Sequence, residues 1–209
     1  QVLSEIPPTD VAVLLKDLGT DDVADILGVL PQEQANESLA LMKTEDSTEI
    51  ADLLKYPKDT GGSIMTTEFF SLSEDATAQE AIRRLQHATD AEMVFYIYVT
   101  DKEDHLVGVL SLRQLLTVQP LTPLKHIMTR DVISVTVDVD QEEVARQVAR
   151  YNLLAIPVVE KDGTLVGIIT VDDVLNLIRE EATEDMLKMA GAADGDTHLK
   201  SSSFDAARS

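Results

Sequence analysis

The sequence predicts an α+β protein in which an N-terminal α-helical domain precedes a tandem pair of β-α-β-β-α modules. Two observations carry this prediction. Apolar residues recur at helical spacing over the first quarter of the chain, and one order of elements occurs twice in the remainder. The chain has 209 residues with a hydrophobic content of 44%, so it can bury a globular core, and wholesale disorder is not expected.

Four short helices are expected within residues 1–56, which we assign to the helical domain. In the first two, apolar residues return every three or four positions after Thr9 and again after Thr20, the expected cap of the second helix. Pro31 suits the first turn of a third helix, and a fourth is expected near residues 47–54. Tight connections between such short helices indicate a small superhelical bundle.

A linker is expected at residues 57–63, because proline and glycine interrupt the helical pattern there. We interpret Gly61 and Gly62 as a hinge into the first module rather than as a phosphate-binding loop. The two modules are then assigned to residues 64–120 and 121–180.

The repeat is visible in the order of predicted strands and helices. The first copy contains strand 69–72, helix 77–89, strands 94–100 and 106–111, and a helix from Leu112. The second copy contains strand 132–135, helix 141–151, strands 155–159 and 165–170, and a helix from Val171. Four extra residues near 90–93 lengthen the first copy. Each module is therefore expected to pack a small sheet against helices.

The charge balance excludes several classes of protein. Lys and Arg number 17 against 38 Asp and Glu, which gives a formal charge of −21. Nucleic-acid binding and docking on anionic lipid both need basic surfaces, so neither is expected, whereas divalent cations would neutralise this surplus. The absence of cysteine excludes disulfides and thiolate sites. Without an apolar run long enough to cross a bilayer or a signal-peptide pattern, the chain is expected to be soluble and intracellular.

The helix from Val171 offers carboxylates for such a cation. Asp173, Glu180 and Glu184 fall within roughly 40° of one another on a helical wheel. An acidic helix face is commonly just solvated, and that alternative stays open. Arg179 is the only base between Val171 and Asp185, so the mutual repulsion favours a cation or a partner.

Two other acidic groups stand at expected helix starts. Asp21 and Asp25 are four residues apart on one helical face, and Asp140 and Glu142 open a helix of the second module. Acidic residues in a first turn stabilise the positive end of a helix, so capping is an alternative to metal binding for Asp21, Asp140 and Glu142. Asp25 lies beyond the first turn, where capping explains it less well.

Matching motifs identify the kind of module. They are Ile64-Met65-Thr66, Ile127-Met128-Thr129, Leu106–Ser111 and Leu165–Thr170. With these motifs the repeat resembles a tandem pair of cystathionine-β-synthase-type (CBS) domains.

A narrower resemblance rests on four further segments: residues 56–68, Tyr96-Ile97-Tyr98-Val99, residues 138–146 and residues 170–175, the last continuing into 180–185. Through them, residues 9 to about 190 resemble the cytoplasmic part of the MgtE family of magnesium channels and transporters. The resemblance implies a CBS-mediated homodimer. It also implies that residues 181–209 form a connecting helix and tail leading to a membrane domain absent from this chain, at the cytoplasmic face of the cell membrane.

The resemblance also implies binding residues. The implied Mg²⁺ ligands are Asp21, Asp25, Asp140, Glu142, Asp173, Glu181, Glu184 and Asp185. Asn152 and Asn176 stand where related proteins have carboxylates, which puts part of this set in doubt. CBS pairs often hold ATP or another adenosine nucleotide, and the residues implied here are Tyr96, Ser111, Arg113 and Thr170. Gln114 replaces the acid expected to contact the ribose, and Thr170 is equally explained as a helix cap.

The function expected from these observations is Mg²⁺ sensing by the regulatory region of an MgtE-like transporter, in which Mg²⁺ bridges acidic surfaces. The alternatives are an adenosine-nucleotide sensor without a Mg²⁺ switch and a stand-alone CBS protein. No enzymatic activity is expected, because the four histidines form no ligand pair at helical spacing and no nucleophile motif is present.

Overall fold

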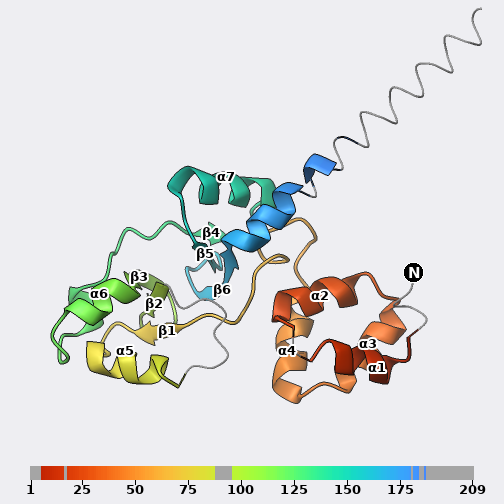
Figure 1. Cartoon of the computed structure of the whole chain (residues 1–209), viewed down its shortest axis with the longest axis horizontal. Helices are drawn as coiled ribbons and strands as arrows, with labels where there is room; N and C mark the ends of the chain where they lie inside the picture. Colours follow the sequence, from red (N-terminus) through yellow and green to blue (C-terminus); the bar gives the residue numbers. More distant parts are fainter. Residues whose placement is uncertain (1–5, 17, 88–95, 180, 184–185, 187–209) are drawn as a thin grey trace, which may run out of the picture.

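The computed structural model describes residues 6–16, 18–87, 96–179, 181–183 and 186 (Figure 1). The helical domain and the two modules appear in the expected order, which confirms the α+β fold class. The extra residues expected at 90–93 lie outside the described part of the chain.

The helical domain consists of α1 (Pro8–Leu14), α2 (Thr20–Gly28), α3 (Gln32–Ala40) and α4 (Thr44–Leu53). In it α2 packs on α4 and α1 packs on α3. Val23 and Leu27 of α2 meet Ile50 and Leu53 of α4 in the buried core, as expected from their three- and four-residue spacing.

Thr20 has a different role from the expected helix cap. The N-cap of α2 is Gly19, and no side chain caps this helix. The buried Thr20 hydroxyl instead lies 3.3 Å from Thr66 Oγ1 and 3.1 Å from Thr67 Oγ1, and it accepts a hydrogen bond from Thr67 N at 3.3 Å. The prediction was wrong because a tertiary partner competes for this hydroxyl. Thr20 therefore fastens the start of α2 to the segment that leads into the first module.

The two modules repeat one topology. The first contains β1 (Ser71–Ser73), α5 (Ala78–Leu85), β2 (Tyr96–Thr100), β3 (Leu106–Ser111) and α6 (Leu112–Thr117). The second contains η2 (Leu124–His126), β4 (Val135–Thr136), α7 (Gln141–Tyr151), β5 (Ala155–Val159) and β6 (Leu165–Thr170). A further helix covers residues 171–179, which we call the exit helix. In each sheet the middle strand pairs in parallel with the short first strand and antiparallel with the last.

Both faces of each sheet are buried, and alternate residues serve the two faces. In β2, Ile97 and Val99 enter the core of the first module, whereas Tyr98 enters a separate cluster shared with the second module. Ala155 and Ile168 of the second module belong to that shared cluster. The two sheets therefore pack against each other, while helices cover their outer faces.

The modules also exchange the segments that lead into them. Thr66, ahead of β1 in the first module, forms two backbone hydrogen bonds with Ile168 of β6, at 2.9 and 3.0 Å. Thr129, ahead of β4 in the second module, forms the equivalent pair with Val109 of β3, both at 2.9 Å. We call residues 65–66 and 128–129 the leading segments.

Two glycines make this exchange possible. A Cβ atom at Gly167 would lie 2.6 Å from Met65 Sδ, and one at Gly108 would lie 2.4 Å from Met128 Sδ. Both distances are well below van der Waals contact, so each strand accepts the methionine of the other module's leading segment only where it lacks a side chain.

The expected hinge at Gly61 and Gly62 is replaced by a docked segment. Gly61 N donates to Val139 O at 2.7 Å, and Gly62 N donates to Val137 O at 2.8 Å. A Cβ atom at Gly62 would lie 2.6 Å from the Tyr56 ring. Both glycines are buried and required for close packing, so the linker is fixed on the second module.

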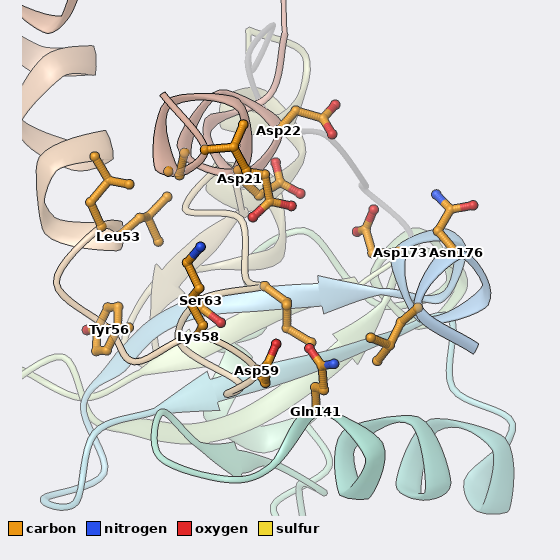
Figure 2. A pocket seen from close by; sticks show the side chains of 17 residues that line it. Asp21, Asp22, Leu53, Tyr56, Lys58, Asp59, Ser63, Gln141, Asp173 and Asn176 are labelled. Atoms are coloured by element: carbon orange, nitrogen blue, oxygen red, sulfur yellow. The ribbon is translucent and has the colours of Figure 1, made fainter. Parts of the chain in front are cut away.

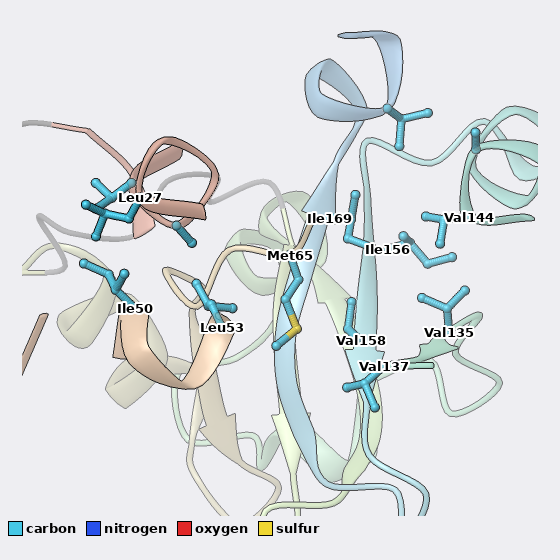
Figure 3. Packing of buried hydrophobic residues seen from close by; sticks show 14 of the residues in the cluster. Leu27, Ile50, Leu53, Met65, Val135, Val137, Val144, Ile156, Val158 and Ile169 are labelled. Carbon is cyan, nitrogen blue, oxygen red and sulfur yellow. The ribbon is translucent and has the colours of Figure 1, made fainter. Parts of the chain in front are cut away.

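One hydrophobic cluster runs from the helical domain into the second module (Figure 3). It joins Leu53 of α4 to Ile169 of β6 and Val144 of α7, with Met65 of the leading segment between them. The helical domain is therefore packed on the second module through apolar contacts as well as through Thr20.

The close approach at Gly167 gives a test of the exchange. Gly167→Ala is expected to lower the free energy of unfolding by about 1–3 kcal/mol in urea denaturation, because Met65 and the Thr66 carbonyl must move. Gly28→Ala is the control, because its Cβ would meet only Leu54 Cδ2 at 3.8 Å. That control should leave stability unchanged or raise it by up to about 1 kcal/mol. Equal stability of the two variants would contradict the packing argument.

Candidate functional site

A cavity of about 560 Å³ lies between the helical domain, the linker and the exit helix (Figure 2). Its lining includes five carboxylates, and we call it the acidic pocket. They are Asp21, Asp22, Asp25, Asp59 and Asp173. The structure thus brings together three of the expected Mg²⁺ ligands, Asp21 and Asp25 from α2 and Asp173 from the exit helix.

Asp21 is the buried member of this group, with 8% of its surface exposed. The contact of Thr20 with Thr66 and Thr67 holds the first turn of α2 against the module, which covers the neighbouring carboxyl group. Burial, and then the negative charge of Asp173, raise the pKa of Asp21 from 3.8 to about 6. A favourable interaction with the helix N-terminus is therefore outweighed by burial at this position.

Asp173 faces Asp21 from the exit helix (Figure 2). Burial raises its pKa, and the hydrogen bond donated by the Thr170 hydroxyl opposes that effect; the charges of Asp172 and Asp22 raise it further. Thr170 is itself buried and holds the Asp173 carboxylate in place. The position of Asp173 is therefore fixed although its charge is unfavourable there.

The donor set of the acidic pocket fits a hard cation. Within the described residues, Asp21 Oδ1 is buried and has no hydrogen-bond partner. Asn176 and Gln141 add amide groups to the lining, and Lys58 is the only basic side chain in it. Carboxylate and amide oxygens are what Mg²⁺ and Ca²⁺ prefer, and a site that keeps coordinated water needs a cavity rather than a close-fitting cage. Asp21, Asp25 and Asp173, with Asn176, could hold such an ion.

The acidic residues at the start of α7 have a structural role. Asp140 is the N-cap of α7, and its side chain accepts a hydrogen bond from Glu142 N at 2.9 Å. Both side chains are exposed. The half-buried Glu181 accepts a hydrogen bond from Gln141 Nε2 at 2.8 Å, which connects this helix start to the segment after the exit helix. The structure shows the capping interaction that the sequence offered as an alternative for Asp140.

The remaining expected ligands are Glu184 and Asp185, which lie outside the described residues. Asn152 has a local explanation in the fold. It ends α7 in the left-handed conformation, with φ 50°, where asparagine is well tolerated. The presence of an amide at this position is thus accounted for by backbone geometry.

Three of the four residues expected to bind a nucleotide lie near one another, because Tyr96 of β2 pairs with Ser111 of β3 and Arg113 follows at the start of α6. Ser111 caps α6 and forms a reciprocal capping box with Gln114, Arg113 is exposed on α6, and Thr170 is bound to Asp173. Tyr96 alone of the four lines a second cavity of about 140 Å³, which we call the tyrosine pocket.

The tyrosine pocket contains a residue that sequence reasoning missed. Tyr98 is 1% exposed, and its hydroxyl has no hydrogen-bond partner within the described residues. The only sequence signal for this residue was a tyrosine within an apolar strand, because its hydroxyl is then carried into the space between two sheets. The sequence also gave no sign of the contact from Tyr56 OH to Glu160 Oε1, at 3.1 Å, which ties the linker to the second module.

Comparison with known proteins identifies both parts of the chain. Residues 1–59 match the MgtE intracellular N domain, and residues 62–120 and 124–180 each match the CBS domain. A curated relative, "Magnesium transporter MgtE" of Thermus thermophilus, is 43% identical over 178 residues, which cover 83% of this chain and 39% of the relative. The chain therefore spans about two fifths of that protein's length. Within the described residues, no helix is both long and apolar enough to cross a membrane.

Two solved structures resemble the fold over most of its length. The crystal structure of the soluble part of a magnesium transporter superposes with a TM-score of 0.80 at 42% identity, covering 86% of this chain and 71% of the other. The cytosolic domain of the Mg²⁺ channel MgtE in complex with ATP gives a TM-score of 0.66 at 38% identity, covering 84% and 77%.

The buried Asp21 predicts a pH-dependent stability. Because its folded-state pKa of about 6 exceeds 3.8, its contribution to stability is present below about pH 4 and is lost as the pH rises through about 6. As the pH rises over this range, the unmodified chain should lose up to about 3 kcal/mol of unfolding free energy compared with Asp21→Asn, which has no carboxyl group to ionise at this position. Urea denaturation in a metal chelator at several pH values measures this difference.

The matched control is Glu33→Gln, which removes an exposed carboxylate from the first turn of another helix, α3, outside the acidic pocket. Its stability should follow that of the unmodified chain across the pH range. A pH profile of Asp21→Asn that runs parallel to both would show that burial of Asp21 does not control its ionisation.

Proposed function

Because the chain belongs to the MgtE family, with an MgtE intracellular N domain followed by two CBS domains, we propose that it senses Mg²⁺ for a magnesium transporter. In this proposal the chain regulates the transport carried out by a membrane domain of the full-length protein, at the cytoplasmic face of the membrane. It has no catalytic step of its own.

The observation that carries the proposal is the acidic pocket between the helical domain and the exit helix. Asp21 and Asp173 come from different domains; burial raises the pKa of both carboxyl groups, and the charge of Asp173 raises that of Asp21 further. Two like charges roughly 4–8 Å apart near a protein surface repel by about 2–4 kcal/mol. This repulsion acts directly across the domain contact, so its neutralisation is a means of closing that contact.

The proposed switch follows from which elements hold these carboxylates. With a bound cation supplying positive charge, Asp21 and Asp25 keep α2 beside the exit helix. Without it, the ionised Asp173 repels α2, and the contacts of Thr20 and the hydrophobic cluster oppose separation. The exit helix leads onward along the chain, so a change in its packing would reach the segments that follow, including Glu181, Glu184 and Asp185. Asp140 and Glu142, at the start of α7, would join the ligand set through the Gln141–Glu181 contact.

A homodimer through the CBS modules forms part of the proposal. Four apolar side chains here are each 43–50% exposed: Tyr151 at the end of α7, Leu154 in the loop that follows it, and Leu175 and Ile178 of the exit helix. Val171 N donates to Leu154 O at 2.9 Å, so these two elements are adjacent. A second copy covering this apolar group would bring two exit helices together.

Limited proteolysis and urea denaturation across a millimolar range of Mg²⁺ test the switch. Saturating Mg²⁺ is expected to slow cleavage, reduce the hydrodynamic radius and raise the free energy of unfolding by about 2–4 kcal/mol. The double variant Asp21→Asn with Asp173→Asn should lose most of this response, because it removes the repulsion and two ligands together.

The control double variant, Glu33→Gln with Glu37→Gln, removes the same charge from the exposed face of α3. It should respond to Mg²⁺ as the unmodified chain does. If both double variants respond equally, Mg²⁺ acts through general screening of the acidic surface and the acidic pocket is not the sensor.

Adenosine-nucleotide sensing is the second candidate, and the unpartnered Tyr98 hydroxyl in the tyrosine pocket favours it. A cavity of about 140 Å³ is smaller than typical small-molecule sites. It would therefore take a base, with the ribose and phosphates lying outside, toward Ser111, Arg113 and Thr170. The capping hydrogen bonds of Ser111 and Thr170 would have to be shared with the ligand.

Calorimetric titration with AMP in a metal chelator separates the two candidates. If the tyrosine pocket holds the base, Tyr98→Phe should weaken AMP binding by about threefold to tenfold, because one hydrogen bond is lost. Tyr151→Phe, at an exposed tyrosine outside the pocket, should leave it unchanged. Binding of AMP without Mg²⁺-dependent compaction would favour the nucleotide sensor, and equal affinities of the two variants would exclude this pocket.

A further inference from the structure

A mixed nitrogen and oxygen cluster occupies the turn between β2 and β3. Asp101, Glu103 and His105 each present one ligand atom there, and these atoms lie within 4.8 Å of one another. Asp101 and His105 are partly exposed, and Glu103 is exposed, so an ion could enter from solvent. None of the three lines the acidic pocket or the tyrosine pocket.

The distance between two of these atoms is the distance between neighbouring ligands of one metal ion. Asp101 Oδ2 and His105 Nδ1 are 3.0 Å apart. Two ligands at about 2.1 Å from an ion and at right angles to each other are separated by about 3.0 Å, whereas tetrahedral ligands are about 3.4 Å apart. The pair therefore matches adjacent ligands of an octahedral or five-coordinate site, and only the exposed Glu103 side chain must close in.

The surroundings add negative charge to the cluster. Asp162, in the turn between β5 and β6, interacts electrostatically with His105. Lys161 Nζ pairs with Asp138 Oδ2 at 3.1 Å, and the exposed Lys102 forms no ion pair with the cluster within the described residues. Three carboxylates thus surround one imidazole.

The repeat shows that the turn does not need a histidine. Thr164 stands opposite His105 where the two turns meet, and Asp104 and Gly163 share the positive φ that shapes each turn, at 63° and 95°. Leu106 N bonds Gly163 O, and Leu165 N bonds Asp104 O, both at 3.0 Å. Since one turn is built with threonine at the equivalent place, the turn does not depend on the His105 imidazole, which can exchange its hydrogen bond with Asp101 for a bound ion.

We propose that Asp101, Glu103 and His105 form a binding site for a borderline divalent transition-metal ion such as Mn²⁺, Co²⁺ or Zn²⁺. A nitrogen ligand distinguishes this site from the all-oxygen acidic pocket, because Mg²⁺ favours oxygen and imidazole favours the transition metals. An ion held here, with Asp162 as a further or water-mediated ligand, would connect the two turns at the contact between the modules. The site is independent of the proposed Mg²⁺ switch.

Titration of the whole chain with Co²⁺ in saturating Mg²⁺ tests the proposal, because Mg²⁺ occupies oxygen-only sites. Calorimetry should show one saturable Co²⁺ site, with a visible absorption band from the bound ion. His105→Thr, which copies the residue of the second turn, should weaken this site by at least about tenfold. Substoichiometric Mn²⁺ should broaden the ring-proton NMR signals of His105 and leave those of His126 sharp.

His126→Thr is the matched control, because it makes the same change at an exposed histidine in η2. Glu103→Gln is a second variant that leaves the Asp101–His105 contact intact; it should also weaken Co²⁺ binding, even if His105→Thr disturbs the turn. Equal Co²⁺ affinity in the unmodified chain, His105→Thr and Glu103→Gln would overturn the proposal, as would the absence of saturable binding in Mg²⁺.

Discussion

The exchange of leading segments between the two modules is the constraint on which the rest of the structure depends. Met65 crosses over Gly167 and Met128 crosses over Gly108, where any side chain on the strand would overlap the methionine. The backbone of Thr66 is thereby fixed to β6, at whose end the exit helix begins. Thr20 binds the neighbouring hydroxyls of Thr66 and Thr67, so the helical domain is held near that helix. The acidic pocket is a geometric consequence of this chain of contacts.

Electrostatic repulsion within the acidic pocket opposes the packing contacts that form the pocket. Apolar packing through Met65 and Leu53 draws the helical domain onto the second module, whereas the buried Asp21 and the facing Asp173 resist that approach. A contact in which attraction and repulsion are both of a few kcal/mol is sensitive to small changes in charge. Thr170 maintains the repulsion, because its hydroxyl holds the Asp173 carboxylate facing the pocket by a hydrogen bond.

Local sequence signals predicted most of the second module closely, although β4 covers Val135–Thr136 and not the expected residues 132–135. Helix α7 and strands β5 and β6 have the bounds expected from periodicity. Asp140 is the N-cap of α7, one of the two roles that the sequence offered for it. The same signals failed where a side chain or backbone group had a distant partner. Thr20 looks like a helix cap and Gly61-Gly62 looks like a hinge, because nothing local reveals that Thr67, Val137 and Val139 supply their hydrogen bonds. In both places, hydrogen-bond partners that are distant in the sequence replace the local interactions that the sequence suggests.

The sequence by itself determined the elements, their repetition and the surplus of carboxylates, because periodicity, capping and net charge are properties of neighbouring residues and of composition. Only the tertiary structure decided which carboxylates meet. Asp21 and Asp173 are far apart in the sequence and face one cavity, whereas Asp140 caps its own helix and does not line that cavity. The reason is physical: burial and Coulomb interaction depend on distances through space, and those distances are set by the crossing of Met65 over a glycine in the other module.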